Sequence, residues 1–197
     1  MPFLKNLSNN LKHIIENKFR LSTCQEFNFY AMDESRFGLM TIERRIITAM
    51  GVKPKLPYQH RFQNTYLFGA FSPTNGDHFT LELPYCNSAC FQEYLNELAI
   101  YKPDEFKILI LDNGAFHKAK ALEIPPNIEL MFLPPYSPEL NPAEQMWRYL
   151  KDRLANKIFT TIENMSDEIA KIYQNITDEI VYSIAGRSLY TTMPFKC

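Results

Sequence analysis

The spacing of apolar residues changes along the chain, and each change predicts a different element. Over residues 3–19 apolar side chains recur every three or four positions, which predicts one amphipathic helix. The segment 27–34 alternates as a strand does, and it places Asp33 at the end of the first core strand. The segment 39–52 is expected to be further strand followed by a loop.

A hairpin and a helix are predicted in the middle of the chain. Residues 64–73 and 77–84 form two expected strands joined across Thr74, Asn75 and Gly76, and Asn-Gly is a strong signal for a tight turn. Residues 88–101 follow a helical period instead. The side of this helix that is expected to be buried consists of Phe91, Tyr94, Leu95 and Leu98.

The next part of the chain alternates strands and helices. Residues 106–112 (FKILILD) are a continuous apolar run, as expected of a central strand covered on both faces. A short helix from about Phe116 and a strand over 127–133 are expected to follow. This order predicts an α/β fold, a mixed sheet with helices on both faces, as in ribonuclease H-like folds.

Two helices are predicted after the proline-rich segment PPYSPELNP. The first covers 142–157. The second is long, with a capping box of Thr160 and Glu163 at its start and Gly186 at its end. Its apolar side consists of Ile162, Met165, Ile169, Ile172, Ile176, Ile180 and Ile184.

Composition is that of an ordinary globular domain, with 46% hydrophobic and 22% charged residues. No apolar run approaches the roughly 20 residues of a membrane helix, and the N-terminus does not resemble a secretory signal. The cysteines lack the paired spacing of zinc sites, so reduced thiols in a cytosolic protein are expected. They are Cys24, Cys86, Cys90 and Cys197.

The net charge of −1 does not indicate a nucleic-acid-binding protein, but the charge is unevenly distributed. Six basic residues between Arg36 and Arg61 accompany a single acid, Glu43. A basic stretch can bind phosphates even on a neutral protein. A solvated charged hairpin explains the same pattern equally well.

Two aspartates stand where strands are expected to end. Asp33 closes the first core strand, and Asp112 closes the apolar run 106–112. A carboxylate beside an apolar sheet must be desolvated or left at its edge, and strand ends of open α/β sheets collect ligand-binding groups. For a single aspartate a turn or helix cap would be the simpler explanation. Two at strand ends favour a site.

Glu144 has both a structural and a functional interpretation. It follows Asn141 and Pro142 as the third residue after a cap, so it could complete a capping box. It also lies with Arg148 and Lys151 on a polar stripe, beside the apolar one. Such a helix packs on a sheet and borders a cleft. The apolar stripe, in which Trp147 is expected to be a core residue, consists of Ala143, Met146, Trp147, Leu150 and Leu154.

Three carboxylates at one sheet edge would suit hard divalent cations. Mg²⁺ takes oxygen ligands and uses few protein carboxylates, so three acids can serve two ions. Two ions about 4 Å apart can activate a water or hydroxyl and stabilise the leaving oxygen of a phosphodiester. A phosphatase is disfavoured, because no second aspartate follows a nucleophilic one at the strand end.

Three motifs together resemble the catalytic blocks of a known family. AMDESRFGL, ILILDNGAFHKAK and FLPPYSPELNPAEQMW resemble those of DDE transposases of the mariner superfamily, in its bacterial insertion-sequence branch. The resemblance covers roughly residues 25–190 and implies a ribonuclease H-like catalytic domain over 25–197. Residues 1–24 would then be a helix or connector, the remnant of a link to a helix-turn-helix region.

The resemblance implies a metal triad of Asp33, Asp112 and Glu144. Glu139 is a rival third acid, since it lies in the same loop, but the family's acid follows Asn-Pro-x, as Glu144 does. The interval from Asp112 to Glu144 is 32 positions (144 − 112), slightly shorter than is usual in the family. DNA contacts are expected from Asn113, His117, Arg148, Lys151, Arg44 and Arg45, although His117 could equally be a polar residue near a helix start.

The implied reaction uses Mg²⁺ or Mn²⁺, with two ions expected. Cleavage at the ends of a mobile element would free a 3′-hydroxyl, which would attack target DNA, typically at TA. The implied partners are DNA, a second copy of the chain in a homodimer, and a helix-turn-helix protein from an upstream reading frame. The implied location is the bacterial cytoplasm and nucleoid.

Two other interpretations remain open. A stand-alone ribonuclease H-like nuclease would use the same carboxylates, although the SPELNPAE segment argues against it. A transposase-derived DNA-binding or interaction protein would have lost catalysis, although all three acids are intact.

Overall fold

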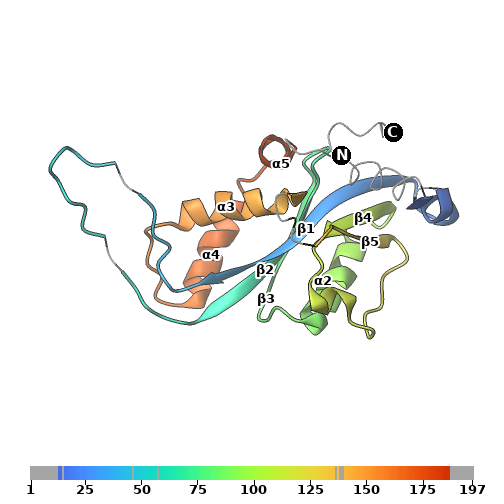
Figure 1. The fold of residues 1–197 in the computed structure, drawn as a ribbon, viewed down its shortest axis with the longest axis horizontal. Coiled ribbons are helices and arrows are strands. Elements are labelled where there is room, and N and C mark those ends of the chain that lie inside the picture. Colours follow the sequence, from blue (N-terminus) through green and yellow to red (C-terminus); the bar gives the residue numbers. More distant parts are fainter. Residues whose placement is uncertain are drawn as a thin grey trace.

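A five-stranded mixed sheet forms the centre of the protein (Figure 1). The computed structural model describes residues 13–186 except 15, 46, 57, 136, 138 and 139. The strand order is β3-β2-β1-β4-β5; β1 is antiparallel to β2 and parallel to β4, β2 is antiparallel to β3, and β4 is parallel to β5. The strands are β1 Glu26–Gly38, β2 Asn64–Phe71, β3 His78–Leu83, β4 Glu105–Leu111 and β5 Ile128–Phe132.

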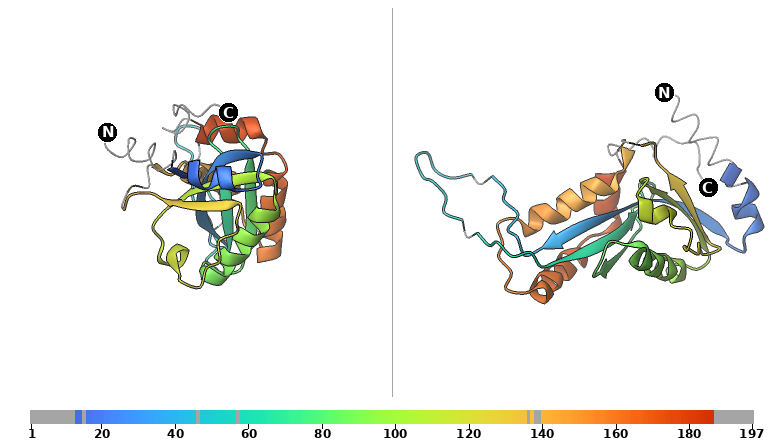
Figure 2. Two further views of the ribbon diagram at one scale, coloured as in Figure 1. Left: turned by 90° about the vertical axis from the view of Figure 1, so that its right-hand side faces the viewer. Right: turned by 60° about the horizontal axis from the view of Figure 1, so that its bottom comes forward.

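Helices cover both faces of the sheet (Figure 2). On one face α2 (Ser88–Ile100) packs its four predicted apolar residues against β1, β2 and β4. On the other face α3 (Ala143–Leu154), α4 (Ile162–Tyr173) and α5 (Asp178–Ala185) share a core with β1 and β2. The mixed sheet with helices on both faces, predicted from the sequence, is confirmed.

The central strand and the hairpin also agree with the sequence. Every residue of β4 is buried, as the continuous apolar run predicts. Strands β2 and β3 meet at a turn in which Gly76 has a φ of +83°, a conformation that favours glycine. A Cβ there would lie 1.9 Å from the backbone oxygen of Asp178, so the turn also packs against the start of α5.

The prediction of strand over 39–52 is wrong. Instead β1 runs on to Gly38, and residues 39–63 form an arm that has no regular secondary structure in its described part and projects beyond the sheet (Figures 1 and 2). Only the base of the arm keeps pairing, where Leu39 N–H donates to the Gln63 carbonyl at 3.0 Å and Thr41 N–H donates to the Gln59 carbonyl at 3.1 Å. Farther out, Pro54 cannot donate to a ladder, which works against a regular strand pair.

The prediction of one long C-terminal helix is also wrong, since two helices, α4 and α5, take its place. Thr161, not Thr160, caps α4, and its side chain accepts a hydrogen bond from Asn164 N–H. Thr177 caps α5 in the same way, with two acidic residues following it in the first turn. This second cap offers the backbone an alternative to continuous helix, and the apolar period persists through the break. Gly186 ends α5, as predicted.

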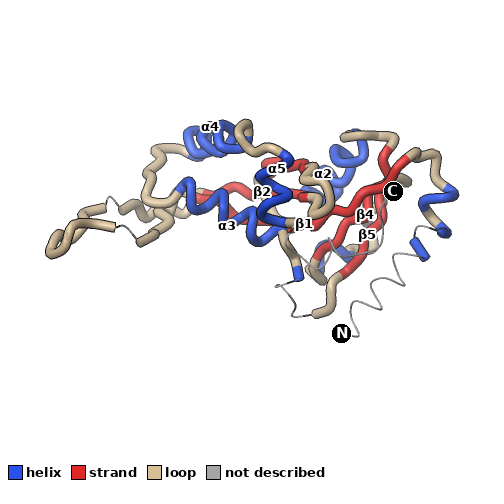
Figure 3. Tube along the Cα trace, turned by 90° about the horizontal axis from the view of Figure 1, so that it is seen from above, coloured by secondary structure: helices blue, strands red, loops and turns tan. Residues whose placement is uncertain are grey.

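The ends of the chain are described in part. The predicted helix over 3–19 lies mostly outside the described residues; within it 13, 14, 16 and 17 are helical, and a 3₁₀ turn, η1 (Phe19–Leu21), follows. The short helix expected near Phe116 is another 3₁₀ turn, η2 (Ala115–Lys118). The arm and η1 lie at opposite ends of the molecule (Figure 3). No helix in the described residues has the length and hydrophobicity to cross a membrane.

Candidate active site

Strand pairing brings the two predicted aspartates side by side. The parallel register of β1 and β4 ends with Ala31 opposite Ile110, so Asp33 and Asp112 occupy the next same-facing positions. Asp112 follows the end of β4, as predicted. The prediction that Asp33 ends its strand is wrong, because β1 continues five residues beyond it (38 − 33) while paired with β2. Asp33 therefore lies in the part of β1 that extends beyond the end of its pairing with β4.

A cleft of about 450 Å³ opens at this edge of the sheet. The first turn of α3 forms one wall and contributes Glu144, and the loop after β5 forms another. The three predicted acids therefore border a single cavity. The lining residues are Asp33, Asp112, Asn113, Gly114, Leu133, Pro134, Pro135, Ser137, Asn141 and Glu144.

Asp33 is held by the only tryptophan of the chain. The indole N–H of Trp147 on α3 donates to Asp33 Oδ2 at 3.0 Å, while the ring is 4% exposed in the core. Burial, together with the charges of Glu34 and Asp112, raises the pKa of Asp33 from 3.8 to about 7, although this hydrogen bond opposes the rise. Trp147 is a core residue, as predicted; its bond to Asp33 was not foreseen.

Asp112 is held by two groups that both use its Oδ1 atom. Gly114 N–H donates to this oxygen at 2.8 Å, and His117 Nδ1 lies 3.0 Å from it. The other ring nitrogen of His117, Nε2, lies 2.9 Å from Glu34 Oε1. Glu34 belongs to β1, so the chain Glu34–His117–Asp112 connects β1 to the end of β4 through one imidazole.

The His117 ring is buried between these acids, with an exposed fraction of 3%. Burial lowers its pKa, but the hydrogen bond and charge of Glu34 and the charge of Asp112 outweigh it, so the pKa is raised. Among the described residues, His117 Nδ1 has no well-aligned hydrogen-bond partner despite its short distance to Asp112. We take the contact to be electrostatic, since distance alone satisfies attraction between charges while a hydrogen bond needs alignment.

Gly114 is required by this close approach. A Cβ at position 114 would lie 2.9 Å from His117 Nδ1 and 3.1 Å from Asp112 Oδ1. The φ of Gly114 is −49°, so the need is for space and not for a left-handed backbone. The glycine of the motif DNGAFH thus leaves room for the close approach of Asp112 and His117.

Asn141 connects α3 to the strand that carries Asp33. Its amide nitrogen donates to the Met32 carbonyl at 2.9 Å, and its Oδ1 accepts from Ala143 N–H at 3.1 Å. The predicted capping box is wrong: Pro142 occupies the cap position, and the Glu144 side chain makes no hydrogen bond within the described part of the chain. The exposed carboxylate of Glu144 is therefore left at the cleft.

The other predicted residues fall into different places. Asn113 lines the cleft, donates to the Leu133 carbonyl and accepts from Lys118. Arg148 is exposed on α3, and Arg45 is exposed on the arm. Arg44 is paired with Asp152 at 2.6 Å, and Lys151 lines a neighbouring pocket. Glu139 lies outside the described residues.

The donor set of the cleft fits a hard cation in chemistry and charge. The ligand atoms of its three acids are oxygens, as Mg²⁺ and Mn²⁺ prefer, and the raised pKa of Asp33 reflects its burial and the neighbouring charges of Glu34 and Asp112. Among the described residues no three acidic, His or Cys side chains converge closely enough to hold a metal ion. The described cysteines are free, and burial together with the acid charges raises the pKa of the Cys86 thiol to about 11.

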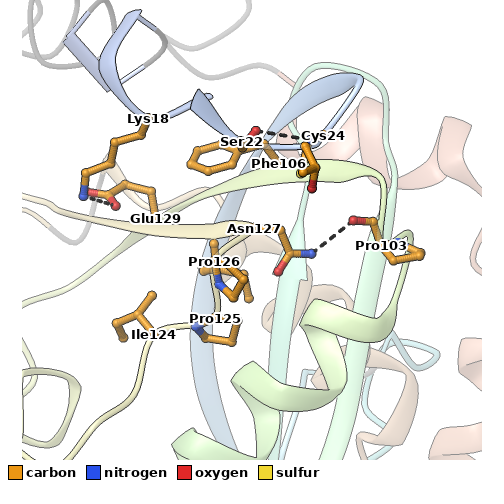
Figure 4. Close-up of a pocket in the computed structure, with 12 residues that line it drawn as sticks. Lys18, Ser22, Cys24, Pro103, Phe106, Ile124, Pro125, Pro126, Asn127 and Glu129 are labelled. Carbon is orange, nitrogen blue, oxygen red and sulfur yellow. Dashed lines mark hydrogen bonds and ion pairs between the residues drawn. The ribbon is translucent and has the colours of Figure 1, made fainter. Parts of the chain in front are cut away.

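A larger cavity, about 610 Å³, lies elsewhere, between η1 and the loop before β5 (Figure 4). Its lining includes Pro103, Pro125 and Pro126, and its one lysine, Lys18, is 2.5 Å from Glu129. The described lining thus offers no unpaired charge and no pair of acids. Size alone therefore does not identify the site; the side chains do.

A sequence model of one protein family, described as DDE superfamily endonuclease, matches residues 28–166. The chain belongs to this family. The matched part of this DDE endonuclease domain includes all three acids of the cleft. A relative named "Uncharacterized protein y4pE/y4sA", from Sinorhizobium fredii (strain NBRC 101917 / NGR234), is 39% identical over 116 residues, which are 58% of this chain and 86% of the relative.

The fold of the DDE endonuclease domain is similar to that of crystallised Mos1 transposase. The Mos1 strand transfer complex matches with a TM-score of 0.61 and 19% identity, over 90% of this chain and 56% of the Mos1 chain. The Mos1 mariner paired end complex with Mn gives 0.62 and 19%, over the same shares. This likeness shows a shared ribonuclease H-like fold, and this chain spans little more than half of the Mos1 chain's length. The resemblance inferred from the three motifs is confirmed for family and fold.

Proposed function

We propose that this domain is the catalytic part of a transposase, which cleaves DNA phosphodiesters with divalent metal ions and joins the freed 3′-hydroxyl to target DNA. One observation carries the proposal: in a chain of the DDE endonuclease family, Asp33, Asp112 and Glu144 border one cleft. The Mos1 complexes named above, one for strand transfer and one with Mn, support strand transfer and a divalent ion.

Asp33, Asp112 and Glu144 would hold Mg²⁺ or Mn²⁺, with two ions sharing the three acids. When bound, such ions activate a water or hydroxyl nucleophile and stabilise the charge of the phosphodiester. The protein's own task is to position oxygen ligands before DNA arrives. Trp147 fixes one oxygen of Asp33, and Gly114 with His117 fixes one oxygen of Asp112. In each aspartate the second oxygen is thereby left for a ligand.

His117 and Glu34 are positioning residues in this proposal. Removing a residue that hydrogen-bonds to a metal ligand commonly lowers the metal affinity about 10- to 100-fold. Glu34 stabilises the charged form of His117, and a charged imidazole offsets part of the repulsion that Asp112 meets from Asp33. The DNA-contacting role expected of His117 is not supported by its burial of all but 3%.

The proposed assembly extends beyond this chain. DNA is the substrate, with element ends and a TA target; two copies act together, and a helix-turn-helix protein supplies sequence recognition. Residues 25–197 are proposed as the catalytic domain, and residues 1–24 as a connector.

The experiment is incubation of the purified chain with supercoiled plasmid and Mg²⁺ or Mn²⁺, beside the Asp112→Asn variant. Metal-dependent nicking by the wild type and none by the variant is the expected result. Joined products from a pre-nicked oligonucleotide with a free 3′-hydroxyl would establish strand transfer. Hydrolysis without joining would favour the stand-alone nuclease, and DNA binding without nicking would favour the inactive transposase-derived protein.

A further inference from the structure

A second, basic pocket of about 330 Å³ lies between the base of the arm and α3. Arg36 from β1, Arg61 from the arm and Lys151 from α3 contribute to its lining, together with Gly38 and Asn64, where β1 and β2 begin to pair. The described lining holds three cations and no acid. The cations come from segments that are far apart in sequence, so the fold itself gathers the charge.

These three cations have no ion-pair partner among the described residues, whereas two other cations on this side of the molecule do. Arg44 pairs with Asp152 at 2.6 Å, and Lys157 pairs with Glu168 at 2.6 Å. In the described part of the chain, no ion pair involves Arg36, Arg61 or Lys151. The pocket therefore keeps its positive charge for a ligand.

The pocket is preformed. Arg61 is anchored by donating from Nη1 to the Thr160 carbonyl at 2.7 Å, which leaves its other N–H groups for a ligand. Gln59 secures the arm, because its amide donates to the Phe159 carbonyl at 3.0 Å. At Gly38 a Cβ would lie 3.0 Å from the Gln63 carbonyl oxygen, so a larger residue would push the two sides of the pocket apart.

The positive charges of Arg36 and Arg44 affect the side chain of Lys151. Its ammonium lies 5.5 Å from the centre of the Phe37 ring, and its side chain is half-buried. Burial lowers the pKa of Lys151, and Arg36 and Arg44 lower it further against the opposing charge of Asp33. A bound anion would relieve this repulsion. Lys151 lies about two turns after Glu144 on α3, so the pocket and the cleft lie along the same helix.

We propose that this pocket binds a backbone phosphate of the DNA substrate, a few nucleotides from the scissile phosphodiester in the cleft. The inference rests on the proposed function and adds a second contact to it. Lys151 follows Glu144 by seven residues (151 − 144), which is about 10 Å along a helix. That length corresponds to about three steps of duplex DNA. The base of the arm is thus a phosphate-binding element that sets the register of DNA in the cleft.

The test is the salt dependence of duplex binding, measured by fluorescence anisotropy in EDTA so that no cleavage occurs. The double variant R61Q/K151Q is compared with the charge-matched variant R20Q/K171Q, whose exposed side chains lie on η1 and α4 outside the pocket. Losing one phosphate contact should lower the slope of log K against log salt by about one, and affinity by about 10-fold at low salt. The control should keep the wild-type slope, and thermal unfolding of both variants establishes that they fold.

Each outcome decides. A lower slope in the pocket variant alone supports the phosphate site, and rescue by R61K/K151R strengthens it. Equal slopes in both variants, from a protein that still binds and nicks DNA, would overturn this inference and leave the proposed function intact. A wild-type chain that neither binds nor nicks DNA would overturn both.

Discussion

The two ends of strand β4 each gather ionisable groups, but in opposite ways. At its end, Asp33 and Asp112 occupy neighbouring positions, and burial together with the charges of Glu34 and Asp112 raises the pKa of Asp33 to about 7. At its start, Asp77 is buried, with an exposed fraction of 5%, yet its pKa is lowered. In the first cluster acids repel each other, whereas in the second Asp77 is stabilised by three hydrogen-bond donors.

Donors around Asp77 explain the difference. Burial raises the pKa of Asp77, but hydrogen bonds from Lys102, Tyr101 and Tyr30 outweigh burial. The ammonium of Lys102 lies 2.6 Å away, and the hydroxyls of Tyr101 and Tyr30 lie 2.7 Å and 2.5 Å away. The hydroxyl of Tyr30 also lies 2.7 Å from Glu105, whose pKa burial raises. The single hydroxyl proton of Tyr30 is thus shared between two carboxyl groups whose pKa values shift in opposite directions.

This contrast separates structural from functional acids within a single sheet. Satisfied buried groups stabilise the fold, because removing one partner leaves the others unpaired. Unsatisfied acids cost stability and persist where a ligand offsets them. Substitutions at the two ends should therefore have opposite effects on stability and activity.

The largest expected effect is on catalysis at the cleft end. Glu144→Gln should lower metal-dependent plasmid nicking by more than about 100-fold, or about 3 kcal/mol in transition-state stabilisation. The charge-matched variant Glu139→Gln should keep its activity, since Glu144 lines the cleft and follows Asn-Pro-x, the position that the motif resemblance implies for the third acid. Nicking rates are measured from supercoiled plasmid. The opposite ranking would transfer the third ligand to Glu139.

The next effect is a pH dependence that Asp33 produces at the cleft end. Because the folded pKa of Asp33 is raised from 3.8 to about 7, the folded state holds this proton more tightly than the unfolded state. The stability that the proton provides is present below about pH 4 and is lost as the pH rises through about 7, by about 2–4 kcal/mol. Urea unfolding in EDTA should show this loss in the wild type, and a much smaller one in Asp33→Asn. Identical pH profiles would contradict the raised pKa.

At the other end, the expected loss is of stability alone. Asp77→Asn removes the charge that three donors share and should lower the free energy of unfolding by about 2–3 kcal/mol. The neighbouring exposed acid supplies the control, Asp104→Asn, which should change little. Denaturant unfolding at pH 7 measures both. Because the ionised carboxylate of Asp77 is the stabilising form, its contribution should vanish as the pH falls below about 4 and the group is protonated. If Asp77→Asn were as stable as the wild type but impaired in nicking, the acids at this end of β4 would be functional and not structural.

The smallest expected effect is on metal affinity through the groups behind Asp112. Gly114→Ala puts a Cβ 2.9 Å from His117 Nδ1 and 3.1 Å from Asp112 Oδ1, so one of them must move. The metal concentration for half-maximal nicking should rise about 10-fold, with a smaller change in the rate at saturating metal. Unchanged metal dependence in a folded variant would mean that this contact does not position Asp112.

The sequence predicted most of the sheet because its signals are local. The continuous apolar run of β4, the Asn-Gly turn and the stripe on α2 each reflect one element and its burial. The arm and the break before Thr177 were missed because pairing partners and competing caps decide them, and the apolar period continues through both. The local pattern of apolar residues carries no information on which pairing partner or which helix cap is preferred.

The candidate site shows the same division. Asp33, Asp112 and Glu144 were found from motifs and predicted strand ends, which are features of sequence order. The contacts of Trp147 with Asp33, of Glu34 with His117, and of Asn141 with Met32 join residues that lie 83 to 114 positions apart. Only the folded register reveals them, although a glycine between Asp112 and His117 was a usable signal for close packing.

Trp147 allows a direct test of the central claim, which is that the three acids of the cleft bind a divalent cation. It is the only tryptophan, and its indole N–H lies 3.0 Å from Asp33 Oδ2, so its fluorescence reports on this site alone. The measurement is titration of that fluorescence with Mn²⁺ at pH 8, for the wild type and Asp112→Asn. A saturable change in the wild type that weakens by at least about 10-fold in the variant is the predicted result. No change in the folded wild type, or the same titration in both proteins, would contradict the account.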